Sequence, residues 1–103
     1  MEYELIKSDE FADWLNCLKD KIARVKILQR MERARFGNFG DHKNIGGGLI
    51  EMRINFAKGY RIYCSIQNGK LLVLLTGGTK EQQQKDIDKA RALLKIWEQE
   101  NGI

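Results

Sequence analysis

The chain has 103 residues, of which 43% are hydrophobic, and it contains no proline. This length and composition predict one domain with its own core, without a linker. The formal net charge of +4 permits a nucleic acid or an acidic protein as partner but selects neither. No apolar segment after the first methionine predicts a signal peptide, and the longest apolar run, Leu71 to Leu75, is too short to span a membrane. We therefore expect a cytoplasmic protein.

Cysteine and histidine are scarce, which limits redox and metal chemistry. Cys17 and Cys64 do not have the spacing of a metal motif, and both are expected to be reduced packing residues. His42 is the single histidine, which excludes a site with several histidine ligands. We therefore expect no metal and no other cofactor.

The first third of the chain predicts a short strand followed by a helical hairpin. Residues Tyr3 to Lys7 alternate weakly and favour a strand. Ser8 is the expected N-cap of a first helix, and a second helix is expected from near Asp20 to Phe36. The apolar residues at helical spacing are Phe11, Trp14, Leu15 and Leu18 in the first helix and Ile22, Val25, Leu28 and Met31 in the second.

The second helix is strongly basic. From Lys19 to Arg35 the chain has seven lysines or arginines against two acids, Asp20 and Glu32. Four of the basic residues fall on one stripe, namely Lys19, Lys26, Arg30 and Arg33. A stripe of this kind is usually a solvated outer face, and its other use is to dock an acidic partner.

Two strands in the middle of the chain place polar side chains on one face. Residues 49–56 alternate strictly, so Arg53 points away from the apolar side chains. Residues 60–66 alternate in the same way, and Arg61 and Tyr63 share the face opposite the apolar residues. If the two strands pair as a hairpin, these three side chains lie within reach of one ligand.

Glycines mark the turns around these strands. Five glycines between residues 37 and 48 predict a loop, and Asn68-Gly69 predicts a two-residue hairpin turn with positive φ at both positions. Leu71 to Leu75 is apolar on both faces, as expected of a central strand, which Gly77 and Gly78 are expected to end.

The last element is predicted to be a helix that begins at the end of the central strand. Thr79 and Gln82 have the spacing of a capping box. The expected buried stripe is Ile87, Ala90, Leu94 and Trp97. The element order is therefore β-α-α-β-β-β-α, an α+β fold with its helices on one face of an antiparallel sheet.

The polar face suggests a phosphate site. Lys80 stands at the start of the last helix, where free backbone N–H groups favour a phosphate. With Arg53 and Arg61 it could hold a phosphodiester and stabilise the charge of a pentacovalent transition state. Tyr63 could transfer a proton if a neighbouring cation lowered its pKa. Two further phosphate-binding candidates from the glycine-rich loop are Lys43 and His42.

The alternative for these residues is ordinary surface charge, which composition alone favours. Lys80 would then be a solvent-exposed residue at the start of the helix without a binding role, and His42 would be a solvated loop side chain. The aromatic residues Tyr60, Trp14 and Trp97 are expected in the core.

Three segments that cover nearly the whole chain carry a resemblance to a known family: FADWLNCLKDKIARVKILQRMERARFGNFGDHK, GGGLIEMRINFAKGYRIYCSI and LLVLLTGGTKEQQQKDIDKA. The chain resembles the RelE/ParE superfamily of type II toxin–antitoxin toxins, in the phage-derived addiction-module killer branch close to the HigB-type toxins. The resemblance implies one RelE-like domain over residues 1–103, with a curved antiparallel sheet packed against helices.

The resemblance also implies an activity. Many members cut mRNA on the translating ribosome without a metal, by attack of a ribose 2′-hydroxyl on the adjacent phosphate, and a cognate antitoxin neutralises them. The antitoxin is often a helix-turn-helix protein encoded by the adjacent gene. By motif position, Arg61 in GYR resembles the phosphate-binding arginine of the superfamily, Arg53 in EMR resembles another recurrent arginine, and Lys80 matches a cation after the last strand.

The resemblance is incomplete where proton transfer is concerned. RelE carries a tyrosine in its last helix, whereas the corresponding KEQQQKDI has none, and the terminal histidine of some HigB toxins is missing. The candidates that remain for this role are Tyr63, Lys80, His42 and Lys43. Two other functions stay open: a toxin that poisons DNA gyrase, as ParE-type relatives do, and an inactive module that only binds its antitoxin.

Overall fold

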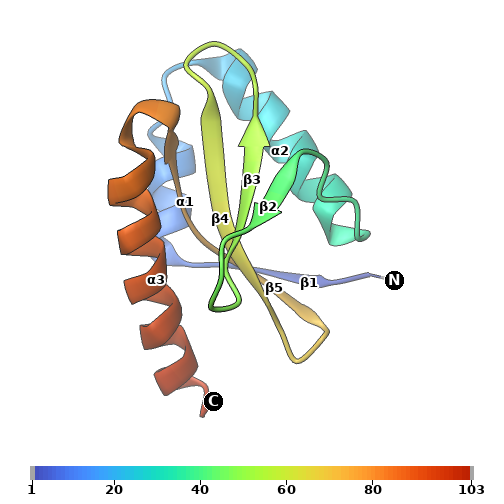
Figure 1. Ribbon diagram of the computed structural model, residues 1–103. Helices are drawn as coiled ribbons and strands as arrows, with labels where there is room; N and C mark the ends of the chain where they lie inside the picture. Colours follow the sequence, from blue (N-terminus) through green and yellow to red (C-terminus); the bar gives the residue numbers. More distant parts are fainter. Residues whose placement is uncertain (1, 103) are drawn as a thin grey trace.

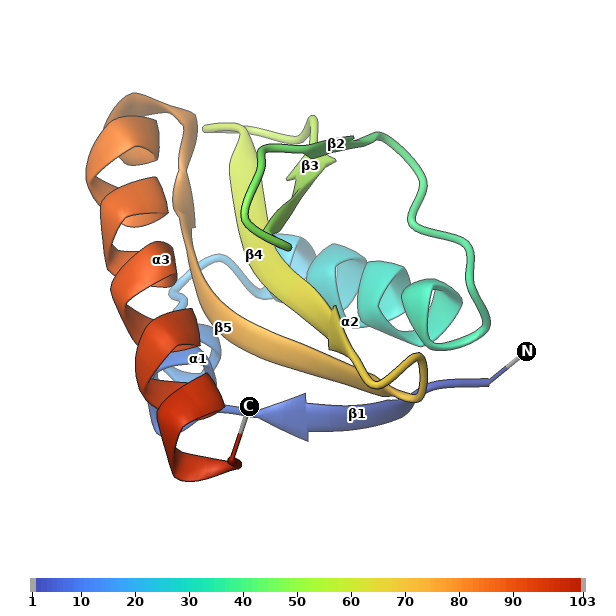
Figure 2. The same ribbon diagram turned by 60° about the horizontal axis from the view of Figure 1, so that its bottom comes forward.

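The computed structural model describes residues 2–102 and shows a five-stranded sheet with helices on both sides (Figure 1). The strands lie in the order β1-β5-β4-β3-β2. Their bounds are Glu4–Lys7 (β1), His42–Asn44 (β2), Ile50–Ile54 (β3), Tyr60–Gln67 (β4) and Leu71–Thr79 (β5). The α+β class is confirmed, and Figure 2 shows how strongly β4 and β5 curve.

Two features of the sheet differ from the prediction. β1 pairs in parallel with β5, and the other three pairs are antiparallel, so the sheet is mixed. This pair joins the first strand of the chain to the last one, and no local sequence pattern encodes such a pairing. The short strand β2 lies inside the segment predicted to be a loop, because the backbone of residues 42–44 pairs with residues 50–52 of β3.

The helices cover both faces of the sheet, whereas the prediction placed them on one. They are α1 (Asp9–Asn16), α2 (Lys21–Arg35) and α3 (Gln83–Glu100), with a short 3-10 helix, η1 (Lys80–Gln82), before α3. The α1 and α2 side chains pack on one face and those of α3 on the other. Because β4 and β5 are buried on both faces, each face needs its own cover.

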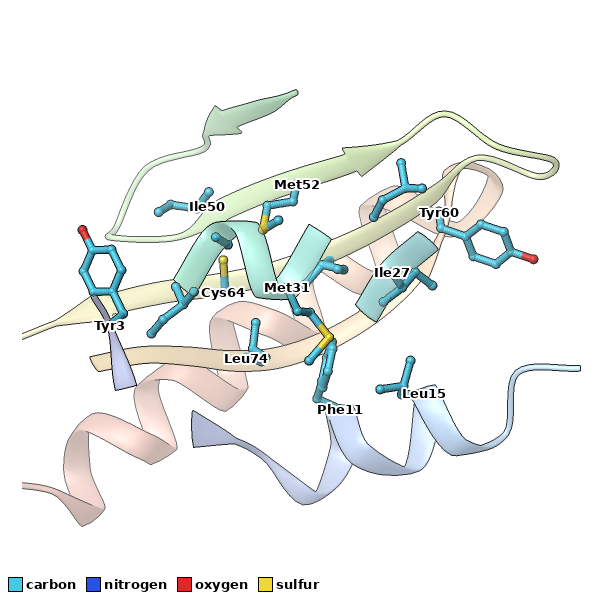
Figure 3. Close-up of a cluster of buried hydrophobic side chains, with 14 of the residues drawn as sticks. Tyr3, Phe11, Leu15, Ile27, Met31, Ile50, Met52, Tyr60, Cys64 and Leu74 are labelled. Atoms are coloured by element: carbon cyan, nitrogen blue, oxygen red, sulfur yellow. The ribbon is translucent and has the colours of Figure 1, made fainter. Parts of the chain in front are cut away.

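The larger core lies between the sheet and the pair α1 and α2 (Figure 3). Phe11 and Leu15 of α1 meet Ile27 and Met31 of α2 over the sheet residue Leu74. The second core lies under α3, where the predicted stripe is confirmed: Ala90 and Leu94 are buried, and Ile87 and Trp97 pack against the same cluster. The expected core position of Tyr60 is confirmed as well.

The predicted orientation of α2 is wrong. Ile22, Val25 and Leu28 are exposed, and the helix turns a different stripe to the sheet. The buried residues are Ala23, Ile27, Arg30, Met31 and Ala34. The helix has two apolar stripes, and the one with small alanines at both ends packs on the sheet, because small side chains let a helix approach closely. Arg30, predicted on a basic outer stripe, is therefore inside.

The central strand continues through Gly77 and Gly78 instead of ending there. A Cβ atom at position 77 would lie 2.3 Å from the ring of Trp14, and one at position 78 would lie 1.8 Å from a carboxylate oxygen of Asp86. The two glycines therefore serve close packing on both faces of the strand. The capping box predicted from Thr79 does not form, since its side chain makes no cap hydrogen bond.

The local signals elsewhere are confirmed. The Ser8 side chain accepts a hydrogen bond from a backbone N–H of α1 as the predicted N-cap, and α2 begins near Asp20 as predicted, where the Asp20 side chain accepts two backbone N–H hydrogen bonds. Asn68 and Gly69 have φ of +54° and +65° in the β4–β5 turn. Between residues 2 and 102, no helix combines the length and the apolarity that crossing a membrane requires.

Candidate phosphate-binding site

The pairing of the strands aligns polar residues in two rows on the α3 face of the sheet. In the first row Arg53 of β3 lies opposite Arg61 of β4, which lies opposite Gly78 of β5. The second row runs Lys43, Glu51, Tyr63 and Thr76 from β2 to β5. Directly opposed residues share a face, with Cβ atoms about 5 Å apart. The predicted juxtaposition of the two arginines is therefore present.

Glu51 is the buried centre of the second row. Its carboxylate accepts hydrogen bonds from Gln83 Nε2 (2.7 Å), Arg53 Nε (3.1 Å) and the Tyr63 hydroxyl (3.2 Å). Burial raises the pKa of Glu51, but these three hydrogen bonds and the Arg53 charge outweigh burial and leave the pKa below its ordinary value. An ionised Glu51 therefore holds one edge of the Arg53 guanidinium, whose side chain stays partly exposed.

Arg61 is buried, with 7% of its surface exposed, yet its guanidinium is poorly paired. Its Nη1 donates one long hydrogen bond of 3.4 Å to the Tyr60 carbonyl, and its Nε has no partner. Within residues 2–102 no carboxylate oxygen lies within 4.0 Å of the guanidinium. Buried polar groups are normally satisfied, so Arg61 retains capacity for an external anion.

A glycine brings Lys80 beside Arg61. The backbone N–H of Lys80 donates to the Gly59 carbonyl at 2.6 Å. Gly59 has φ of +77°, and a Cβ atom there would lie 3.3 Å from Lys80 Cβ and 4.0 Å from Arg61 Nη1. A larger residue would be strained and would crowd both cations. The exposed Lys80 thus stands at the same end of the sheet as the arginine pair.

Tyr63 does not meet the condition that would make it a proton donor to a ligand. Burial and the neighbouring Glu51 charge raise its pKa, whereas the role required a cation to lower it. Its hydroxyl is fully buried and donates to Glu51. Tyr63 therefore supports the carboxylate that holds Arg53.

The two candidates in the glycine-rich segment, Lys43 and His42, lie on opposite faces of the sheet. Lys43 lies opposite Glu51, so it shares the face of the arginine pair and is exposed. His42 lies opposite Met52, on the other face, with its ring 5.6 Å from that of Phe39 and Nδ1 2.8 Å from the Gly40 carbonyl. His42 is therefore not brought to the arginines.

A hollow of about 430 Å³ adjoins the same end of the sheet. Its lining includes Cys17, Lys19, Lys58, Tyr60 and Thr79. Cys17 is exposed here, so its expected packing role is wrong, whereas Cys64 is buried and burial raises its pKa to about 12. Lys19 and Lys58 bring positive charge to the end of the strands, beside the carboxylate of Asp20, which also lines the hollow.

Sequence reasoning missed three polar residues of this region, namely Glu51, Gln83 and Asp86. Asp86 of α3 is buried over Gly78, and its Oδ2 has no partner. Burial raises its pKa, against the opposing charges of Lys89 and Lys85. The one sequence signal was the pair of glycines, which permits a carboxylate of α3 to lie on the strand beside Arg61.

Fold and site together define a small α+β protein with two opposed arginines at one end of its sheet, of which Arg61 is buried and poorly paired. A family model described as "Phage derived protein Gp49-like (DUF891)" matches residues 13–95. The chain therefore belongs to the Gp49-like family, which is of the addiction-module killer, or toxin, type. Membership of this type implies an antitoxin partner.

The chain is also similar to a protein of Haemophilus influenzae whose description is "Uncharacterized protein". The two are 48% identical over 83 residues, which cover 81% of this chain and 84% of the relative. The similarity spans nearly the same share of the chain as the family match.

Proposed function

We propose that the protein is the toxin of a type II toxin–antitoxin module and inhibits translation by cutting mRNA on the ribosome, in the manner of RelE and HigB-like toxins. The family type supports the toxin role. The observation that carries the nuclease role is the buried Arg61 guanidinium, which lies beside a second arginine and has no anionic partner among residues 2–102. This substrate would place the protein in the cytoplasm.

The proposed reaction needs no metal. The 2′-hydroxyl oxygen attacks the adjacent phosphorus, the bond from phosphorus to the 5′-oxygen breaks, and the products are a 2′,3′-cyclic phosphate and a 5′-hydroxyl. The proton lost by the 2′-hydroxyl is balanced by the proton gained by the leaving oxygen. Arg61, Arg53 and Lys80 would bind the non-bridging oxygens, whose charge grows in the transition state. Each such donor contributes about 3 kcal/mol.

The remaining residues take supporting roles in this proposal. Glu51 holds Arg53, and Tyr63 holds Glu51. Lys80 and Arg61 both lie beside Gly59, so the exposed Lys80 amine becomes the leading candidate for proton transfer. Lys43 would contact the RNA backbone from the arginine face, and His42 would contact it only if the RNA reached the other face.

Arg61→Ala tests the proposal directly. We expect growth inhibition and ribosome-dependent cleavage to fall by about 100-fold or more, from the loss of one transition-state donor. Primer extension on transcripts after induction measures the cleavage, and circular dichroism checks the fold. Lys95→Ala, a remote change on the exposed side of α3, serves as the control and should cut like the parent. A folded Arg61→Ala protein that cuts like the parent would refute the assignment.

One observation favours a second candidate, a toxin that poisons DNA gyrase. Tyr63 is the tyrosine on the arginine face of the described chain, and it is buried with a raised pKa, so residues 2–102 offer no accessible tyrosine proton donor there. The same primer extension separates the two functions. Discrete cuts linked to codons support the nuclease, whereas intact transcripts together with DNA breaks support gyrase poisoning. If expression leaves growth unaffected, the chain is an inactive module that only binds its antitoxin.

A further inference from the structure

Helix α2 carries an apolar stripe that faces away from the protein. The exposed fractions are 62% for Ile22, 53% for Val25 and 43% for Leu28, and the C-cap residue Phe36 is 57% exposed. At 100° per residue the first three span about 120° of the helix, opposite the buried stripe that contains Ile27. We call these four residues the α2 stripe. Figure 1 shows α2 at the periphery, with the sheet on one side only.

Positive charge borders the α2 stripe. The helix contains six basic residues and one acid, Glu32, and only Arg30 of the six is buried. By helical spacing Arg24 lies along one border, Lys26 and Arg33 lie along the other, and Lys21 lies within the stripe at its N-terminal end. In the described part of the chain, none of these four forms an ion pair with a carboxylate. The surface therefore combines unpartnered apolar area with unneutralised cations.

We propose that the α2 stripe is the docking site of the antitoxin, and that the docked segment is an amphipathic helix with acidic flanks. An apolar helix face laid along the stripe would bury the four side chains, and its acidic borders would meet the cations on both sides. From Ile22 to Phe36 the stripe measures about 21 Å, which is the length of a helix of about four turns. The inference rests on the chain being the toxin of a toxin–antitoxin module.

Charge selects this occupant over two others. A second copy of the chain would set basic borders against basic borders, which opposes a symmetric dimer through this face. An anionic membrane would satisfy the cations, but by helical spacing the exposed Glu32 falls within the stripe, and its carboxylate would oppose insertion into an anionic surface. The stripe also lies on the face opposite the arginine pair, so the docked helix would not contact Arg61.

The test is the double substitution Val25→Glu and Leu28→Glu, compared with Ile96→Glu. Ile96 on α3 is 50% exposed, so the control places one glutamate, against two in the double variant, at a similarly exposed apolar residue of another helix. Calorimetric titration with the purified product of the adjacent reading frame measures binding. We expect the double variant to bind at least tenfold more weakly and Ile96→Glu to bind within twofold of the parent. In growth assays the double variant should stay toxic and escape neutralisation.

Each other outcome has a defined meaning. Parental affinity in the double variant, or no binding of the adjacent product by the parent, overturns the inference. So does a dimer of the parent in sedimentation, or its binding to vesicles with anionic lipid, if either is lost in the double variant. A chain that is not toxic but binds through the stripe overturns the proposed function and leaves the docking site standing. Stripe variants that are toxic and still neutralised overturn the docking site and leave the proposed function standing.

Discussion

Two buried arginines, Arg30 and Arg61, occupy regions of opposite character. Arg30, at the corner of α2 and β3, donates to three carbonyls: that of Arg53 at 2.5 Å, that of Phe39 at 2.7 Å and that of Asp41 at 3.0 Å. Arg61, at the open end of the α3 face, makes one bond of 3.4 Å. Each has an unpartnered Nε. The number of satisfied donors, and not burial or charge, separates a structural arginine from one that is available to a ligand.

The largest expected effect comes from exchanging the two arginines for methionine one at a time. Arg30→Met removes three hydrogen bonds of a charged donor and leaves the carbonyls of Arg53 and Phe39 without it, while the Asp41 carbonyl keeps the Arg53 N–H. We therefore expect a loss of about 3 kcal/mol in the free energy of unfolding. For a domain of this size the loss lowers Tm by more than about 10 °C. Arg61→Met removes one long bond and a poorly paired charge, and it should change stability by less than about 1 kcal/mol. Thermal and urea unfolding measure both.

The opposite ranking would remove the basis of the comparison. If Arg61→Met were the more destabilising change, Arg61 would be a structural residue, and its proposed place in phosphate binding would lose its physical support. Arg30→Lys is a useful companion, because one ammonium cannot reach three carbonyls in the geometry of the guanidinium fork. It should recover less than half of the lost stability.

A smaller effect is expected at Glu51, the buried carboxylate that holds Arg53 beside Arg61. Glu51→Gln keeps the volume but removes the charge that Arg53, Tyr63 and Gln83 share. We expect a loss of about 2 kcal/mol, since hydrogen bonds to a charged group are worth more than neutral ones. Because the pKa of Glu51 is lowered in the fold, its contribution is present above the ordinary glutamate pKa and is lost as the pH falls through the folded pKa.

The measurement is the difference in unfolding free energy between the parent and Glu51→Gln across the acid range. The difference should shrink as the pH falls, because the protonated carboxyl and the amide then resemble each other. A difference that stays constant with pH would mean that the Glu51 charge is not part of the network.

Much of the fold could be predicted where the signal is local. The N-cap Ser8, the start of the second helix near Asp20 and the turn at Asn68-Gly69 depend on a few adjacent residues, and all three predictions are confirmed. The parallel pairing of β1 with β5 and the packing of α3 on the second face join segments far apart in the chain. Periodicity could not choose between the two apolar stripes of α2, because either one suits a helix.

The candidate site shows the same division. Alternation and hairpin register were sufficient to place Arg53 opposite Arg61. The buried carboxylates of Glu51 and Asp86 were missed, because acidic residues are almost always exposed and nothing in their own segments marks an exception. The evidence for Asp86 lay in another element, at Gly78, where the absence of a side chain makes room for the carboxylate.

The smallest expected effect concerns Asp86, which lies over Gly78, the residue opposite Arg61, and whose Oδ2 has no partner within residues 2–102. Burial raises the pKa of Asp86 in the fold, so its contribution to stability is fully present below the ordinary aspartate pKa and is lost as the pH rises through the raised folded pKa. Asp86→Asn replaces the buried carboxylate by a neutral amide, so the variant does not lose stability when the pH rises. We expect it to be more stable than the parent at neutral pH by about 1 kcal/mol.

Unfolding of the parent and of Asp86→Asn at a series of pH values isolates the contribution of Asp86 to the pH dependence of stability. The contribution of Glu51 has the opposite sign, and it cancels because it is the same in both proteins. The advantage of the variant should disappear in acid, where the parental carboxyl is protonated. A variant that is less stable than the parent at neutral pH would show that the Asp86 carboxylate is paired, and the neighbouring Arg61 would then be the first partner to examine. That outcome would also reduce the charge that Arg61 has available for a phosphate.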